Sequence, residues 1–292
     1  MIKIFPLIFI LLWSSAFITT KPIIDNSDPF SALAFRFLIV AIGFFLFSIY
    51  SKQKIIINQK NFTESFFSGV LFHGLYLGGV FFSISKGMPT GIAALIVTLQ
   101  PILTNALSGP ILDEKVSIKQ WIGVFLGFIA IFLLIGPPDS FADRSMVPWV
   151  LLAMICPICY TFENVFIDIK KPIEVNSITL ALGSSAITIL ILLPVVFYFE
   201  LFIDIEYPFQ KIEFSIIALG FITAVAYTLF IYLITNAGAV FASNVGYVVT
   251  ISGVIWCIVL FQETHSYWVW LSLITMIIGL SLVSPRRKTK KY

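Results

Sequence analysis

The sequence has little charge for a chain of 292 residues. It contains 18 Lys and Arg residues and 15 Asp and Glu residues, so that 11% of the chain is charged while 59% is hydrophobic. Soluble domains carry about 25% charged residues, because charge keeps their surface in water. So few charged residues cannot cover the water-facing surface of a globule of this size, which excludes a typical soluble enzyme. With a mean hydropathy of +1.01, the chain is predicted to have lipid as its main solvent.

Cysteine and histidine are also scarce. The stretch Cys156-Pro157-Ile158-Cys159 has the spacing of a redox dithiol, but it lies in an apolar run, where free cysteine behaves as a small hydrophobe. The two histidines, His73 and His265, are expected at different depths. The sequence has no His/Cys/Asp metal cluster, no Gly-rich phosphate loop and no nucleophile elbow. It therefore predicts no catalytic residue, no metal and no cofactor, and its net charge of +3 does not indicate nucleic-acid binding.

Long apolar runs fill most of the chain. At about 20 residues per membrane-spanning helix, ten spans are predicted. They cover residues 4–20, 31–50, 65–86, 90–110, 119–136, 147–168, 177–199, 214–236, 240–261 and 267–284. The runs lack the period-two alternation of barrel strands, and helices satisfy their own backbone hydrogen bonds in lipid. The predicted fold class is an all-α integral membrane protein with ten transmembrane helices.

Basic residues predict how these helices are oriented. If the N-terminus is cytoplasmic, 13 of the 18 Lys and Arg residues fall in cytoplasmic segments, four fall in outer segments, and Arg36 lies within a span. Cytoplasmic loops carry such an excess of Lys and Arg. We therefore expect both termini to be cytoplasmic.

The two halves of the chain resemble each other at an offset near 149. The offset aligns Ala93 with Ala242, Glu114 with Glu263, Ser117 with Ser266 and Trp121 with Trp270. The alternative interpretation is that apolar helices align with anything, which explains the spacing of Glu, Ser and Trp less well. Five spans per half would insert the second copy upside down, as in many secondary transporters. We predict five-helix repeats at residues 1–138 and 145–285, the second inverted, and a basic cytoplasmic tail at 286–292.

The N-terminal stretch also fits a cleavable signal peptide, with Lys3, an apolar run and Ser14-Ser15-Ala16. Because the second half holds a match for this first helix, we expect the segment to be kept.

Several motifs, in order along the chain, resemble the drug/metabolite transporter superfamily, specifically its EamA-like ten-helix members. They are Leu12-Trp13-Ser14-Ser15-Ala16-Phe17, Arg36-Phe37, Ala93-Ala94-Leu95-Ile96, Gln100-Pro101, Glu114, Ser117, Gln120, Gly123, Glu263 and Gly279. The resemblance implies a central cavity lined by the helices at 4–20, 65–86, 90–110, 147–168, 214–236 and 240–261, with 119–136 and 267–284 peripheral. Thr250 and Ser252 stand where such repeats often carry proline, so a kink there is not expected.

Glu163 is the most informative polar residue, because an acidic side chain within an apolar span is costly unless it is buried among helices or wetted by a cavity. Tyr160, Glu163 and Asn164 share one helical face by their i, i+3, i+4 spacing. One interpretation is a proton or cation site that lines the cavity. The other is a protonated carboxyl, or one that snorkels to the inner surface.

Further candidates for the lining of the cavity share faces of the helices that the resemblance places around it. They are Trp13, Phe17, His73, Tyr76, Gln100, Tyr227, Asn244 and Tyr247. The alternative for each aromatic residue is simple packing. Arg36 is expected to anchor a loop or snorkel, or else to gate the outer side, and depth argues against an Arg36–Glu163 ion pair. Glu114 and Glu263 are interpreted as helix-end cap residues.

The expected function is secondary transport, as an exporter of a small organic metabolite such as an amino acid or a related amphipathic solute, by alternating access. The alternatives are a membrane-embedded enzyme and a non-transporting membrane scaffold. The expected location is the bacterial cytoplasmic (inner) membrane. Expected partners are the solute, the lipid bilayer and protons as a candidate coupling ion, with the chain a monomer or a homodimer.

Overall fold

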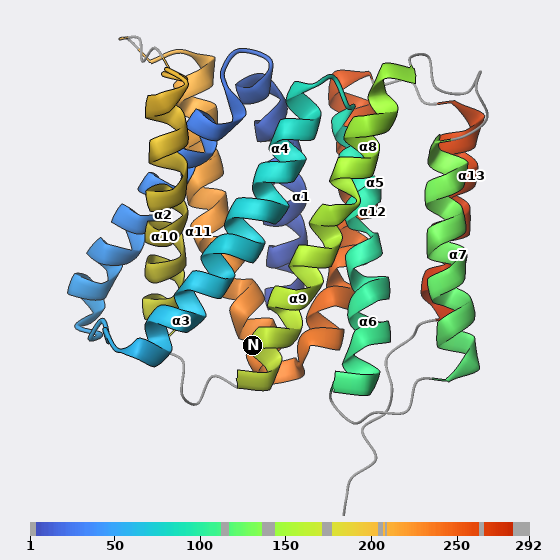
Figure 1. Cartoon of the computed structure of the whole chain (residues 1–292), viewed down its shortest axis with the longest axis horizontal. Coiled ribbons are helices and arrows are strands. Elements are labelled where there is room, and N and C mark those ends of the chain that lie inside the picture. The colour runs from blue at the N-terminus through green and yellow to red at the C-terminus, as the bar shows by residue number, and fades with distance from the viewer. Residues whose placement is uncertain are drawn as a thin grey trace, which may run out of the picture.

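The computed structural model describes residues 4–111, 117–135, 144–170, 177–203, 207, 209–262 and 266–282. All regular structure in these residues is helical, and most helices run along a common direction (Figure 1). The elements are α1 (Phe5–Ile24), α2 (Pro29–Ser51), α3 (Gln59–Ser68), η1 (Gly69–Leu77), α4 (Gly78–Ser85), α5 (Thr90–Val97), α6 (Leu99–Ile111), α7 (Ile118–Ile135), η2 (Arg144–Met146), α8 (Val147–Ala153), α9 (Ile155–Lys170), α10 (Ser177–Tyr198), α11 (Lys211–Ala237), α12 (Ala239–Phe261) and α13 (Tyr267–Leu282).

Within the described residues, eight helical stretches are long and apolar enough to cross a membrane. Two shorter apolar helices accompany them, at Ile118–Ala130 in α7 and Tyr267–Gly279 in α13. The prediction of an all-α membrane protein is therefore confirmed. The count of ten spans and the inverted repeat stay predictions.

Two helix starts form through local hydrogen bonds that the sequence favours. Asp28 Oδ1 accepts from the backbone N–H groups of Phe30 and Ser31 at 2.8 and 3.2 Å, and Pro29 opens α2. At the start of α7, Gln120 Oε1 accepts from the Ser117 N–H at 2.8 Å, while the Gln120 N–H points back to Ser117 Oγ at 3.4 Å. Each arrangement satisfies backbone groups that a helix terminus leaves without partners.

The third helix begins earlier than the apolar pattern predicts, at Gln59 rather than at residue 65. Its first turns are polar, which is why hydropathy misses them. Asn58 caps this start, because its side chain accepts from the Asn61 N–H at 2.8 Å. The same long helix then changes geometry, since Gly69–Leu77 is wound as a π-helix between α3 and α4.

Proline explains two interruptions. A proline ring clashes with the carbonyl four residues earlier and lacks the N–H that would bond to it. Accordingly, α5 ends at Val97, four residues before Pro101, and α8 ends at Ala153, four residues before Pro157. By contrast, α12 runs unbroken from Ala239 to Phe261, as the absence of proline at Thr250 and Ser252 leads one to expect.

The helices α7 and α13 lie side by side at one edge of the molecule (Figure 1). A Cβ added at Gly279 would lie 2.8 Å from the Gly123 carbonyl oxygen, so only glycine allows this close approach. Ser272 Oγ also donates to the Ala130 carbonyl at 2.6 Å. The pair is peripheral, as the family resemblance implies. The other helices form the body of the bundle, in which α1 packs on α11 and α12, and α2 packs on α10.

Candidate functional site

Five buried rings form an aromatic cluster at the centre of the bundle. Its members are Trp13 of α1, Phe72 and Tyr76 of η1, Tyr160 of α9 and Phe230 of α11. Tyr160 stacks on Tyr76 with ring centroids 4.6 Å apart, and its ring lies 4.8 Å from Phe72 and 6.2 Å from Trp13. The cluster therefore joins four helices that are far apart in sequence.

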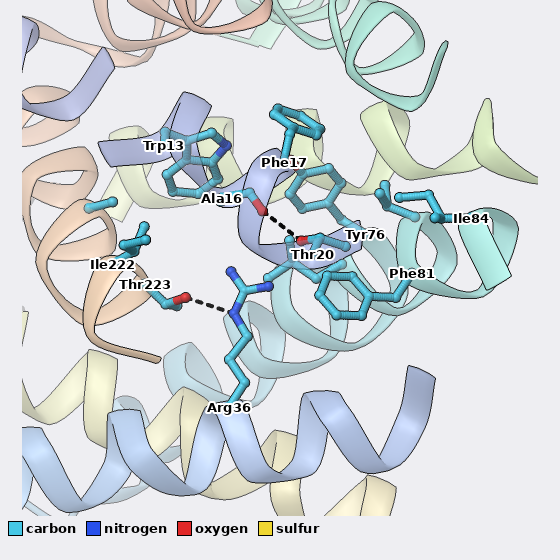
Figure 2. Close-up of a pocket in the computed structure, with 13 residues that line it drawn as sticks. Trp13, Ala16, Phe17, Thr20, Arg36, Tyr76, Phe81, Ile84, Ile222 and Thr223 are labelled. Atoms are coloured by element: carbon cyan, nitrogen blue, oxygen red, sulfur yellow. Dashed lines mark hydrogen bonds between the residues drawn. The ribbon is translucent and has the colours of Figure 1, made fainter. Parts of the chain in front are cut away.

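One cavity borders this cluster on the side of Arg36, and we call it the Arg36 cavity (Figure 2). It is lined by Trp13, Ala16, Phe17, Thr20, Arg36, Tyr76, Leu77, Val80, Phe81, Ile84, Ile222, Thr223 and Ala226. The Arg36 side chain runs from α2 into this space, and its Nε donates to Thr223 Oγ1 of α11 at 2.7 Å (Figure 2). Arg36 is only 4% exposed, so it does not snorkel to the surface.

A second cavity lies on the other side of Trp13 and Phe17, and we call it the Gln100 cavity. It is lined by Phe9, Trp13, Phe17, Val97, Gln100, Pro101, Tyr160, Gly246, Val249 and Thr250. Because Trp13 and Phe17 line both cavities, these two rings separate them. A Cβ added at Gly253 would lie 2.9 Å from the Phe17 ring, so this glycine lets α12 pack against the separating side chain.

Glu163 is fully buried, at 0% exposed. Its Oε1 accepts from the hydroxyls of Ser68 and Tyr227 at 3.2 and 3.1 Å. Among the described residues, Glu163 Oε2 has no hydrogen-bond partner, and neither do the side-chain nitrogen and oxygen of Asn164. Glu163 forms no ion pair within the described part of the chain, with Arg36 or with any other base. It is thus held by two hydroxyl groups from α3 and α11, and it is not snorkelling.

His73 lies between Phe37, which follows Arg36 in the chain, and Tyr227, which donates a hydrogen bond to Glu163. Its ring stacks on Phe37 with centroids 4.3 Å apart and meets the Tyr227 ring at 4.8 Å. Among the described residues, neither ring nitrogen has a hydrogen-bond partner. Such buried polar atoms are rare and call for an explanation by function or by ligand.

The remaining sequence candidates have structural partners or are not described. Gln100 Nε2 donates to Thr104 Oγ1 at 2.9 Å while the residue also lines the Gln100 cavity. Asn244 Oδ1 accepts from Asn105 Nδ2 at 3.2 Å, which links α12 to α6. The Tyr247 side chain, together with Glu114, Glu263 and the tail at 286–292, lies outside the described residues.

Sequence reasoning missed Ser68, Phe72 and Phe230. A signal for two of them exists, because Ser68, Phe72 and Tyr76 recur every four residues, as neighbours on one helical face do. Phe230 follows Tyr227 by three residues and thus lies on its face. Nothing local marks Phe230 among the 30 phenylalanines of the chain.

Cysteines and metal ligands add no chemistry to the site within the described residues. Cys156, Cys159 and Cys257 are buried and form no disulfide with one another. Cys156 Sγ lies against η1 and α4, where a Cβ added at Gly79 would come within 2.5 Å of it. No group of three His, Cys, Asp or Glu residues comes together as ligands in the residues that the structure describes.

A model of the EamA-like transporter family matches residues 2–136 and 147–284. The chain belongs to this family. As an EamA-like protein with eight described helical stretches long and apolar enough to cross a membrane, it is a multi-pass membrane protein. The family resemblance drawn from the sequence motifs is thereby confirmed.

Several relatives of this chain carry transporter names. An uncharacterized inner membrane transporter of Escherichia coli, YedA, is 23% identical over 94% of this chain and 87% of its own. An uncharacterized transporter of Archaeoglobus fulgidus is 24% identical, and the match spans 59% of this chain and only 60% of the relative. A Salmonella typhimurium protein named "Probable amino-acid metabolite efflux pump" is 26% identical over 44% of this chain and 41% of its own.

A solved crystal structure is similar with a TM-score of 0.69, over 97% of this chain and 96% of that chain. The sequences are 16% identical, so the likeness shows the fold alone.

Proposed function

We propose that this EamA-like protein exports a small organic metabolite, such as an amino acid or a related amphipathic solute, by alternating access. The supporting observation is the set of buried polar atoms that have no hydrogen-bond partner among the described residues, on His73, Glu163 and Asn164. Arg36 is buried nearby and has no acidic partner in the described structure. Unsatisfied polar groups are costly at membrane depth, where they mark substrate and ion pathways. The name of the Salmonella relative supports export and the amino-acid class.

Alternating access needs two arrangements of the same bundle, which inverted repeats supply. In the proposed repeats, α2 corresponds to α10 and α7 corresponds to α13. Each of these two helices packs against its counterpart, and the contact of α1 with α11 is matched by that of α9 with η1, a pattern that a two-fold axis between the halves produces. The residues at 1–138 and 145–285 would then rock about the aromatic cluster and open the Arg36 and Gln100 cavities in turn.

The substrate would lie at the aromatic cluster and its two cavities. Trp13, Phe17, Tyr76, Gln100 and Tyr160 line one or both of these cavities. Tyr227, His73 and Asn164 are buried beside the cluster, Asn244 is half-buried, and Tyr247 belongs to the same proposed lining. Aromatic faces with few charges suit a solute that has an apolar body and a polar head.

Glu163 is the proposed proton site. A carboxyl group with two hydroxyl donors, no cation beside it in the described structure and a second oxygen without a partner can exist with or without a proton. Intramembrane Asp and Glu residues serve as proton relays in many transporters.

The proposed location is the bacterial cytoplasmic membrane, with both termini cytoplasmic. A reporter fused after Tyr292, or placed between α2 and α3 at residues 52–58, should read cytoplasmic, and one near Asp204 should read external. An external reading at the C-terminus contradicts the orientation.

Flux tests the proposal directly. Purified protein in liposomes should release radiolabelled amino acids faster than empty liposomes, with an imposed proton gradient increasing the rate. In cells, an overexpressing strain should release more of the solute than a deletion strain. A membrane-embedded enzyme would convert the solute without moving it, and a scaffold would do neither, so either outcome refutes the proposal.

A further inference from the structure

We infer that Arg36 binds the carboxylate of the transported solute, an inference that rests on the proposed function and adds a charge class to it. The guanidinium group is buried, yet it has no acidic partner within the described residues. Arginine keeps its positive charge over the physiological pH range. A cation in this position lacks the anion that buried charges normally pair with.

The contacts around Arg36 leave one edge of the guanidinium open. The Phe37 and Phe81 rings lie with centroids 5.6 Å from the central carbon, in cation–π geometry. Nε is occupied by Thr223 Oγ1, whose own hydroxyl donates to the Leu219 carbonyl at 2.5 Å. The two terminal amino groups have no hydrogen-bond partner among the described residues. They form the end-on fork that matches the two oxygens of a carboxylate.

The open edge is directed into the Arg36 cavity, where the side chain lies between Thr20, Tyr76 and Phe81 (Figure 2). Arg36 is the one charged side chain among the described residues that line this space. A phosphate dianion would need a second cation, so a single fork favours a monoanion. The apolar remainder of the lining, including Trp13, Phe17 and Ile222, would border the apolar body of the solute once alternating access opens this cavity.

Binding of phenyl compounds to the purified full-length protein in detergent tests this assignment. The probes are phenylacetate, its neutral amide phenylacetamide, the amine 2-phenylethylamine and the dianion phenyl phosphate, which share one ring. We expect phenylacetate to bind saturably and at least about tenfold more tightly than each of the other three. Equal binding of phenylacetate and phenylacetamide, or no saturable phenylacetate binding, overturns the inference without any mutation.

Variants then locate the site. Arg36→Gln should weaken phenylacetate binding at least about tenfold and change phenylacetamide binding by less than about twofold. Lys119→Gln, which removes one exposed positive charge on α7, should change neither. Unaltered phenylacetate binding in Arg36→Gln refutes the assignment. If that variant does not fold, Arg36→Lys and Thr223→Val replace it. The first keeps the charge but not the fork, the second removes the Nε acceptor, and each should weaken phenylacetate binding alone.

Binding in detergent tests the carboxylate site and flux in liposomes tests transport, so each proposal can fail without the other. Charge-selective binding without flux of any amino acid would refute the transport function and leave the carboxylate site standing. Flux without charge-selective binding would refute the carboxylate site and leave the transport function standing.

Discussion

Arg36 and Glu163 are both buried and both lack an oppositely charged partner in the described structure, but their surroundings differ. Arg36 borders a cavity, and its terminal amino groups reach into it (Figure 2). Glu163 is completely covered, and two hydroxyl groups hold one of its oxygens. Of the two residues, only Arg36 lines a cavity, whereas the contacts of Glu163 are the buried hydroxyl groups of Ser68 and Tyr227. This difference is the reason for proposing substrate recognition at the Arg36 region and ion coupling at the Glu163 region.

The largest effect is expected for Glu163→Gln, which tests the coupling half of this comparison. Glutamine keeps the size and hydrogen bonding of the side chain but cannot titrate. In liposomes with a proton gradient, uphill transport should fall to background while exchange at equal solute concentrations continues. Wild-type flux should change with pH, and the flux of the variant should not.

Glu163→Ala serves as the control for packing, because it removes the hydrogen bonds as well as the charge. Phenylacetate affinity provides a second control, since Glu163→Gln should leave it within about threefold of wild type if the two regions act separately. If Glu163→Gln drives uphill transport as well as wild type at every pH, Glu163 is structural. His73 would then be the next candidate for coupling.

Trp13→Ala should have the next largest effect, because Trp13 lies between the two cavities. Removing a buried tryptophan costs about 3–5 kcal/mol of stability in protein cores. It would also join the Arg36 and Gln100 cavities, so downhill leak in liposomes should rise several-fold while the proton dependence weakens. Trp13→Phe, which keeps a ring, should restore most of the barrier. Unchanged leak in a well-folded Trp13→Ala variant would show that another layer separates the cavities.

The local features of these regions could be predicted from sequence, and their partners could not. Helical spacing placed Tyr160, Glu163 and Asn164 on one face, and the structure keeps all three buried. Glu163, however, meets Ser68 from 95 positions away, and Arg36 meets Thr223 from 187 positions away. Contacts of this kind depend on how helices pack, for which the apolar pattern carries no information.

Depth alone also misled the interpretation of Arg36. A position near a helix end allows snorkelling, but the ring of Phe81 and the hydroxyl of Thr223 hold the side chain inside. The π-wound segment Gly69–Leu77 has no signal in hydropathy either. Such segments are frequent at functional sites, and this one carries Phe72, His73 and Tyr76.

Tyr227→Phe should have a smaller effect, and it sharpens the role of the hydroxyl groups around Glu163. The change removes one of two hydrogen bonds to Oε1 and keeps the ring contacts with Phe72 and His73. A hydrogen bond of this kind contributes about 0.5–1.5 kcal/mol. Uphill transport should therefore drop about two- to tenfold, well short of Glu163→Gln. Ser68→Ala should lower uphill transport by the same factor, and the double variant Ser68→Ala/Tyr227→Phe should approach the loss seen in Glu163→Gln. An effect on phenylacetate binding instead would contradict the separation of the two regions.

The smallest effect is expected far from both regions, for Ser272→Ala in the α7–α13 pair. Its hydroxyl is as buried as Glu163, but it donates to the Ala130 carbonyl and leaves no polar atom without a partner. Hydrogen bonds between membrane helices contribute about 0.6 kcal/mol on average. Thermal unfolding should therefore shift only slightly, and flux, proton dependence and phenylacetate affinity should equal those of wild type. If Ser272→Ala impairs coupling as Tyr227→Phe does, then burial of a polar group does not single out the Glu163 region. The α7–α13 pair would then have to move together with the body of the bundle during transport.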